Sequence, residues 1–190
     1  GIVLRLGADF NVPSVRSSVK ECYDRVIQDA KLSANYLPEY PLNVMRPSKG
    51  SAYGLLAKAY LSMRVYDSAF KYADLCLQIN NELIDYNGDA DINGSISADI
   101  PFKRFNKEII FYTEMNNNDF ISSPSRAKID TLLYSMYDSS DLRKTAFFKL
   151  SSGYYKFKCI YTGGTSQYFS GIATDEIYLV KAECAAREGN

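Results

Sequence analysis

Residues 53–76 read YGLLAKAYLSMRVYDSAFKYADLC, and this stretch decides the fold. Its apolar residues recur at spacings of three and four, first up to Met63 and again after Asp67, which is typical of two amphipathic helices. Alanines stand at several of the inward positions. Small side chains let two antiparallel helices approach closely, while large ones fill the grooves between them. The stretch therefore predicts a helical hairpin.

The hairpin has the landmarks of a tetratricopeptide-type repeat. The pattern asks for aromatic, leucine and small residues at fixed positions, and these are occupied by Tyr53, Leu56, Ala57, Tyr60, Tyr66 and Ala69. Ala73 and Asn81 depart from it, because a large aromatic residue and a proline are usual there. One such unit cannot bury its apolar face alone. We therefore expect neighbouring repeats, and a binding scaffold before an enzyme.

The composition excludes several classes of protein. The 190 residues contain 22 acidic and 22 basic side chains, with no basic patch to attract nucleic acid. The absence of histidine removes Ser-His-Asp and Cys-His catalytic pairs and His-containing zinc sites from this chain. The four cysteines are widely spaced and predict small buried side chains, although a disulfide stays open. We expect no cofactor, and we expect the chain to be a fragment of a longer protein.

The chain divides by pattern into four segments of one incomplete domain, 1–190. Repeat helices occupy 18–80, the first opened by a capping box between Ser18 and Glu21. A loop with a short strand at 108–114 fills 86–125, with loop signals at 116–118 and Pro124. A short helix from about 129 to 137 and a tyrosine-rich hairpin fill 126–173. A final repeat helix, capped by Thr174, occupies 174–190. The fold class is mainly α, with tetratricopeptide-like repeats, a small β-hairpin and long loops.

Read together, these segments resemble the RagB/SusD family of outer-membrane nutrient-binding lipoproteins. The resemblance rests on motifs in a fixed order, which are Ser18–Tyr23 with Ile27–Ala30 and Leu37-Pro38, Arg46–Tyr53 with Leu55–Leu61, Tyr66–Ala69 with Tyr72-Ala73, Asn106 with Glu108–Phe111, Asp141-Leu142-Arg143, Thr174–Leu179 and Ala182–Asn190. It implies a SusD-like α/α superhelix that is incomplete in this chain.

The resemblance also implies a function. Family members bind glycans or similar nutrients without catalysis, at the cell surface, and pass them to a TonB-dependent transporter. A lipid anchor, which this chain does not include, would hold the protein to the outer membrane. The alternative is a tetratricopeptide-like scaffold that binds a protein or peptide, and a glycosidase is a third and weaker option.

The first candidate site is the tyrosine-rich hairpin, 154–169. A tyrosine offers a sugar an apolar ring for its C–H face and a hydroxyl for its hydroxyls. We expect ligand contacts from Tyr154, Tyr161, Gln167 and Tyr168, with a tight turn at Gly163-Gly164. The other interpretation is that these rings pack a strand against the repeats.

The second candidate is a calcium loop. Asp89, Asp91 and Asn93 occupy positions one, three and five of an EF-hand-like pattern, with glycine at position six. Position twelve should be a bidentate glutamate but is Ile100, so an exposed loop is the other interpretation. Charged residues on the helices, such as Lys20 and Glu21, predict solvated faces.

Overall fold

The computed structural model describes residues 2–115, 126–165 and 167–188. The chain forms two compact units. Unit 1 comprises Gly1–Pro41, Pro47–Asn80 and Glu176–Asn190, and unit 2 comprises Leu42–Arg46 and Asn81–Asp175. The loop predicted at 116–118 and Pro124 lies outside the described residues, as do positions 189 and 190 of the predicted last segment.

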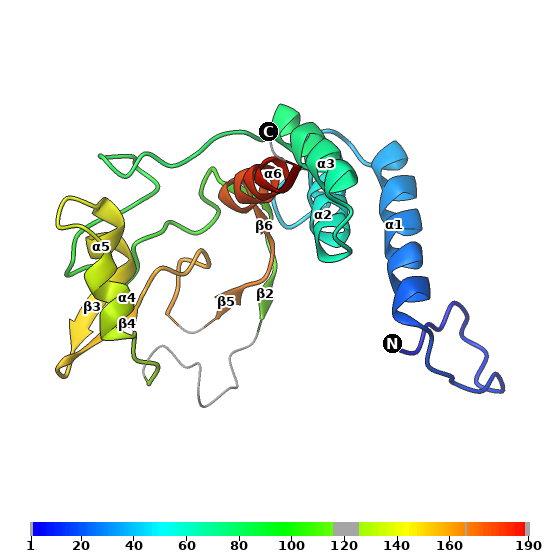
Figure 1. Ribbon diagram of the computed structural model, residues 1–190, viewed down its shortest axis with the longest axis horizontal. Helices are drawn as coiled ribbons and strands as arrows, with labels where there is room; N and C mark the ends of the chain where they lie inside the picture. Colours follow the sequence, from blue (N-terminus) through cyan, green and yellow to red (C-terminus); the bar gives the residue numbers. More distant parts are fainter. Residues whose placement is uncertain (1, 116–125, 166, 189–190) are drawn as a thin grey trace. The chain divides into compact units, whose positions relative to one another are not determined.

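Unit 1 is helical. Its elements are α1 (Val19–Tyr36), α2 (Lys49–Ser62), α3 (Tyr66–Ile79) and, from Glu176 onward, α6 (Thr174–Glu188). In Figure 1, α6 lies beside α2 and α3. The predicted capping box at the start of α1 is confirmed, since Glu21 N–H donates to Ser18 Oγ at 3.2 Å and Ser18 N–H donates to Glu21 Oε2 at 2.7 Å.

Small residues bring α2 and α3 together. Leu56, Ala57, Ala69 and Ala73 are completely buried. At the end of the pair, a Cβ added to Gly50 would lie 2.5 Å from Asn80 Oδ1, so the glycine leaves room for the side chain of the residue that follows α3. The predicted helical hairpin over 53–76 is therefore confirmed.

Two helices differ from what residue type alone suggests. Asp67 is a good capping residue, but α3 begins one residue before it, and the N-cap residue Val65 makes no side-chain hydrogen bond. Asp67 instead lies in the first turn, where a carboxylate favours the helix dipole. In α1, Val19 and Val26 are exposed, because the helix packs on α2 through the smaller side chains of Ala30 and Ala34.

In its described residues, unit 2 contains three small antiparallel strand pairs and two short helices. The pairs are β1 (Ile109–Phe111) with β6 (Ile172–Ala173), β2 (Glu114–Met115) with β5 (Tyr168–Phe169), and β3 (Phe148–Ser151) with β4 (Tyr154–Phe157). The helices are α4 (Thr131–Met136) and α5 (Leu142–Phe147). The mainly helical fold class with small strand pairs is thus confirmed.

The predicted hairpin over 154–169 is wrong. The strand β4 pairs back to β3, through a turn at Ser152 and Gly153 whose φ angles are 53° and 80°. Gly163 has a different role. A Cβ there would lie 2.7 Å from the backbone nitrogen of Arg104, so the glycine permits two segments to pass closely.

Two other predictions hold only partly. The strand expected at 108–114 forms as two short pieces, β1 and β2, with different partners. The helix expected at 129–137 is shorter and is capped by Asp130, whose Oδ1 accepts from Leu132 N–H at 2.7 Å. Leu132 and Met136 on this helix are 70% and 77% exposed, so its apolar stripe is not buried.

Candidate ligand-binding site

Unit 2 holds a pocket of about 350 Å³ with largely aromatic walls, here called the aromatic pocket. Rings from the loops, α5, β4 and β5 line it, which are those of Tyr86, Phe147, Phe157, Tyr161, Tyr168 and Phe169. Its volume lies at the lower end of the range for small-molecule sites, which is about 300–1,000 Å³.

Edge-to-face contacts hold these rings in place. Tyr161 meets Phe102 with ring centroids 4.6 Å apart and an interplanar angle of 82°, and it meets Phe169 at 5.5 Å and 76°. Phe147 makes similar contacts with Tyr86 at 6.0 Å and with Phe157 at 6.1 Å. Such pairs are favoured by the ring quadrupoles, so the walls are ordered without a ligand.

A buried glutamate, Glu108, ties the pocket to the rest of unit 2. Its side chain accepts hydrogen bonds from the backbone N–H of Ile84 at 2.8 Å and from the hydroxyl of Tyr161. Burial raises the pKa of Glu108, and these two hydrogen bonds oppose that rise without cancelling it. Burial, followed by the charge of Asp175, raises the pKa of Tyr161. The Tyr161 hydroxyl therefore keeps its proton and donates it in the hydrogen bond to Glu108.

The backbone of Glu108 is fixed as firmly as its side chain. Its N–H donates to Asn106 Oδ1 at 3.1 Å, which explains the spacing of the asparagine-x-glutamate motif. Its carbonyl accepts from the N–H of Thr174 at 2.8 Å and from the Thr174 hydroxyl at 3.2 Å. The residue predicted to cap α6 thus begins the helix and anchors it to Glu108.

Asp175 follows Thr174 and supplies the pocket with a carboxylate. Its Oδ1 is buried and has no hydrogen-bond partner among the described residues. Buried polar atoms are nearly always paired with protein or water. Asp175 Oδ1 is thus an acceptor suited to a water molecule or to a ligand hydroxyl.

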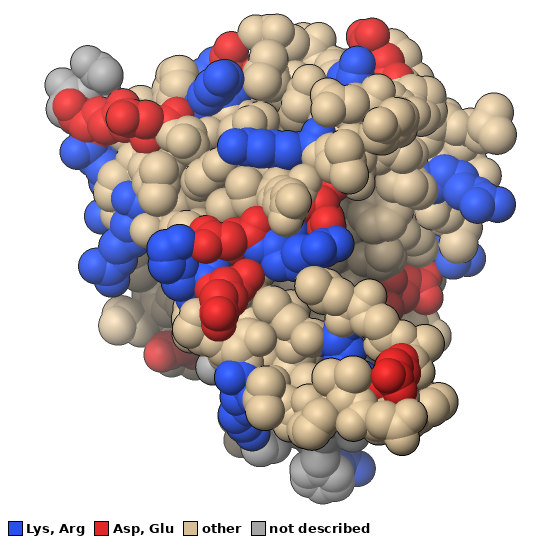
Figure 2. All heavy atoms as spheres, turned by 90° about the vertical axis from the view of Figure 1, so that its right-hand side faces the viewer, with Lys and Arg blue, Asp and Glu red and all other residues tan. Residues whose placement is uncertain are grey.

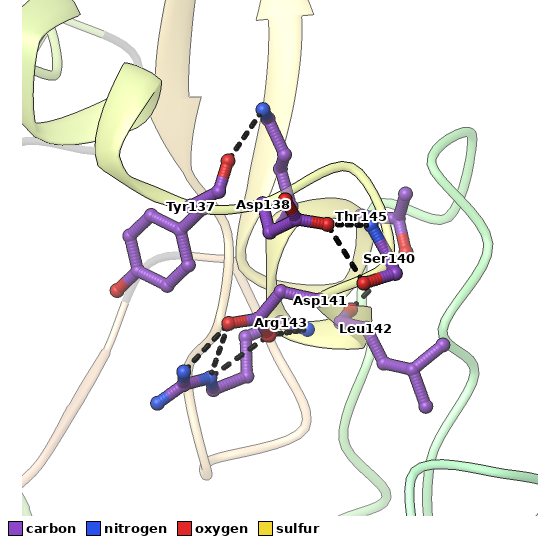
Figure 3. A network of polar contacts seen from close by, with 8 residues as sticks. Tyr137, Asp138, Ser140, Asp141, Leu142, Arg143 and Thr145 are labelled. Carbon is purple, nitrogen blue, oxygen red and sulfur yellow. Dashed lines mark hydrogen bonds and ion pairs between the residues drawn. The ribbon is translucent and has the colours of Figure 1, made fainter.

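A second hollow of about 400 Å³ shares Tyr86 and Asp175 with the aromatic pocket, and Asp141 and Arg143 also line it. Figure 3 shows the Arg143 side chain folded back onto the Asp141 carboxylate, with Nη2 2.6 Å from Oδ2. Asp141 Oδ1 also accepts from Arg143 N–H at 3.0 Å at the start of α5. In this acid-leucine-arginine motif, Asp141 therefore caps α5 and also neutralises the charge of Arg143.

The four predicted contact residues do not share one platform. Tyr161 and Tyr168 line the aromatic pocket. Tyr154 lies on β4 outside that lining, with the ammonium of Lys128 3.5 Å from its ring centroid. Gln167 is exposed, and its carbonyl accepts from Thr162 Oγ1 at 3.1 Å. Ligand contact by these four residues stays a prediction.

Five residues that line the pocket are not among the site residues predicted from the sequence. They are Tyr86, Phe147, Phe157, Phe169 and Asp175, and they come from several segments of the chain. The density of aromatic residues between 147 and 169 was a usable signal. Nothing in the local sequence connects Tyr86 to that segment, because only the fold brings them together.

The carboxylates of the calcium candidate are paired with lysines. Asp89 forms an ion pair with Lys107, and Asp91 accepts from Lys103 Nζ at 3.1 Å. Asn93 Oδ1 accepts from a backbone N–H at 3.1 Å. Within 2–115, 126–165 and 167–188, no group of three or more acidic or cysteine side chains is placed to hold a metal ion. All four cysteines are free thiols.

Charges of both signs are mixed on the face that Figure 2 shows. Figure 2, which faces the side of α1, shows acidic and basic side chains interspersed. On α1, Lys20 pairs with Asp24 at 2.6 Å and Arg25 with Asp29 at 2.7 Å. In the part of the chain that the structure describes, no helix has the length and apolar character required to cross a membrane.

Comparisons with known proteins agree with this fold. Residues 1–61 match the model of a SusD-like family described as starch-binding and associating with the outer membrane. No curated protein matches the chain significantly. Among solved structures, a SusD superfamily protein from Bacteroides vulgatus superposes with a TM-score of 0.69 at 19% identity, over 97% of this chain and 45% of that one.

Two other solved structures give the same result. A SusD-like protein from Bacteroides fragilis has a TM-score of 0.66 at 19% identity, over 100% of this chain and 54% of its own. A SusD-like carbohydrate binding protein from B. vulgatus has a TM-score of 0.65 at 20% identity, over 94% and 42%. The chain therefore spans about half the length of these structures. The first 61 residues thus match a SusD-like family model, and nearly the whole chain has the fold of SusD-like proteins.

Proposed function

We propose that this chain binds a glycan in the aromatic pocket and does not alter it chemically. The observation that carries the proposal is the combination of ordered aromatic walls with the buried, unpaired Oδ1 of Asp175. The C–H faces of a sugar ring pack on aromatic rings, and a sugar hydroxyl can donate to the carboxylate. The SusD-like relatives support this interpretation, since one of them is a carbohydrate binding protein.

The match of residues 1–61 to a family described as associating with the outer membrane supports a wider role. A protein that associates with the outer membrane through a lipid anchor can hold a glycan at the cell surface and deliver it to a TonB-dependent transporter. Among the described residues at the pocket, Glu108 is engaged by Ile84 and Tyr161, which leaves Asp175 as the carboxylate open to a ligand. A glycosidase requires two carboxyl groups free to act on one bond.

Affinity electrophoresis tests the binding. Soluble polysaccharides cast into a native gel should slow the protein, and Tyr168→Ala should reduce the retardation because it removes a wall of the pocket. Tyr36→Ala is the matched control, since the Tyr36 side chain is 83% exposed on α1 and belongs to the other unit. Retardation by no polysaccharide, together with saturable binding of peptides, would instead favour the tetratricopeptide-like scaffold.

Two further measurements address the remaining parts of the proposal. Purified protein incubated with any glycan that it binds should release no reducing sugar, and release would identify an enzyme. Co-purification of the full-length protein with a TonB-dependent transporter from outer membranes would support delivery, and repeated purification without the transporter would count against it.

A further inference from the structure

The aromatic pocket and the second hollow beside it carry more acidic than basic side chains. Among the described residues that line the aromatic pocket, Asp175 is the only charged one. The second hollow shares Asp175 with it. The described lining of this hollow adds two carboxylates, those of Glu108 and Asp141, and one basic side chain, that of Arg143. Carboxylates therefore outnumber basic groups in the two cavities taken together.

The single basic group is bound to a different acid. Arg143 Nη2 lies 2.6 Å from Asp141 Oδ2, and Arg143 Nε donates to Asp141 Oδ1 at 2.9 Å. Figure 3 shows the guanidinium turned onto this carboxylate. Asp175 Oδ1, in contrast, is buried and has no hydrogen-bond partner among the described residues. Asp175 is therefore the acid of these cavities that is open to a positively charged ligand.

The charge of Asp175 also acts on the weak acids around it. Burial is the largest cause that raises the pKa of Glu108, Tyr161, Tyr86 and Cys159, and the charge of Asp175 raises all four further. Each of these groups gains a negative charge when it loses its proton. A wall that resists added negative charge in this way favours a positive charge in the space beside it.

The aromatic walls act in the same direction. The face of an aromatic ring carries partial negative charge and attracts a cation that lies within about 6 Å of the ring centroid. Unit 2 already uses this contact, since the ammonium groups of Lys128 and Lys144 lie 3.5 and 4.9 Å from the ring centroids of Tyr154 and Tyr134. Aromatic walls combined with one carboxylate therefore suit an ammonium group.

Desolvation distinguishes an ammonium from a neutral hydroxyl. A ligand that fills the aromatic pocket displaces water from Asp175, and a carboxylate removed from water is costly unless it is paired. A sugar hydroxyl can donate one hydrogen bond but leaves the charge in place. An ammonium supplies up to three donors together with the opposite charge, and such charge-assisted hydrogen bonds are about twice as strong as neutral ones.

We propose that the aromatic pocket selects saccharides that carry a protonated amino group, with the ammonium bound by Asp175 and the sugar ring packed on the aromatic walls. This inference rests on the proposed glycan binding and narrows it to amino saccharides.

Three oligosaccharides with the same β-1,4-linked backbone test the inference. Isothermal titration of the whole chain would compare oligomers of glucosamine, N-acetylglucosamine and glucose of equal length, which place an ammonium, a neutral amide or a hydroxyl on the same carbon. Below the pKa of the sugar amine, the glucosamine oligomer should bind at least about tenfold more tightly than either neutral ligand, the factor expected for one charged hydrogen bond. Above that pKa the preference should fall to less than about threefold.

Charge variants locate the effect. Asp175→Asn keeps the shape of the side chain and should abolish the preference for glucosamine while leaving the neutral ligands within about threefold of their wild-type affinity. Asp99→Asn is the matched control, because it removes the same charge elsewhere in unit 2 from a side chain that is 72% exposed and paired with Lys149. Circular dichroism would check the fold of each variant. The pH comparison needs no variant and provides a test even if Asp175→Asn folds poorly.

The outcomes separate the two proposals. If a neutral oligomer or another neutral glycan binds at least as well as the glucosamine oligomer, or if folded Asp175→Asn keeps the preference, the amino-saccharide inference fails although glycan binding stands. If no glycan of any kind binds, both proposals fail. Binding of an oligolysine peptide without binding of the glucosamine oligomer would also overturn the inference, because the ammonium would then be recognised on a peptide.

Discussion

Replacing Tyr161 with phenylalanine separates a structural role from a ligand-binding role for this residue. The change removes only the hydroxyl that donates to Glu108. The ring remains, and so do its edge-to-face contacts with Phe102 and Phe169. We therefore expect Tyr161→Phe to lower the free energy of unfolding while leaving the aromatic wall in place.

The magnitude follows from the type of bond. A hydrogen bond to a charged group contributes about 1.5–3 kcal/mol, and its loss here leaves a buried carboxylate oxygen of Glu108 without that partner. With a urea dependence of about 2 kcal/mol per molar, a loss of about 2 kcal/mol would lower the urea midpoint by about 1 M. Ligand affinity should change by less than about threefold if the ring is the part that meets the ligand.

Urea denaturation followed by far-ultraviolet circular dichroism measures the effect, because the chain has no tryptophan to report by fluorescence. Tyr36→Phe on α1 is the control, since its side chain is 83% exposed and surface substitutions usually change stability by less than about 0.5 kcal/mol. A double-mutant cycle with Glu108→Gln isolates the interaction between the two side chains.

Either of two results would refute this reasoning. An unchanged urea midpoint in Tyr161→Phe would mean that the hydroxyl contributes nothing to the fold. A coupling free energy near zero in the cycle with Glu108→Gln would mean that the hydroxyl acts through a group other than Glu108. Loss of ligand affinity at unchanged stability would instead assign the hydroxyl to the ligand.

Three further perturbations test the fold and the buried acid. The pKa of Glu108 in the folded chain is raised above its ordinary 4.5, so stability should fall as pH rises from about 4.5 through the raised pKa, and Glu108→Gln should flatten that part of a stability–pH curve. Leu56→Ala should cost about 2–5 kcal/mol in urea unfolding, because the side chain is completely buried between helices; a loss below about 1 kcal/mol would contradict this packing. Gly171→Ala would set a Cβ 1.9 Å from the carbonyl oxygen of Phe111. We therefore expect about 3 kcal/mol of destabilisation and weaker amide-exchange protection in β1 and β6. Protection equal to that of the wild type would show that the strands do not approach so closely.

The helices of unit 1 were predictable because their signals are local. The capping box at Ser18 and the small residues of 53–76 act over three or four positions, and the structure has both. The strands were harder, because their partners lie elsewhere. Residues 154–157 read as one arm of a hairpin, but both candidate turns contain a glycine with positive φ, and only the pairing of β4 with β3 shows which turn joins the two arms.

The candidate site was predicted only in part, because some of its residues are brought together from distant parts of the chain. Tyrosines at 161 and 168 were found from composition, and both line the aromatic pocket. Asp175 and Tyr86 were not found, because a helix-start aspartate and a loop tyrosine look ordinary in sequence. Their positions in the site depend on contacts that join the β1 region to the start of α6.

Those contacts also explain why the pocket exists without a ligand. Glu108 receives hydrogen bonds from Ile84, Tyr161 and Thr174, which belong to three segments far apart in the chain. Because Thr174 precedes Asp175, fixing Thr174 also fixes the start of the carboxylate's helix. A site held by such hydrogen bonds loses little conformational freedom when a ligand enters. Less of the favourable free energy of contact is therefore lost to ordering the site, and the affinity is higher. Loosening Thr174 should therefore weaken binding without removing any group that touches the ligand. Thr174→Val, which keeps the shape but not the hydroxyl bond at 3.2 Å, provides that measurement by titration, and affinity equal to wild type would show that the tie does not organise the pocket.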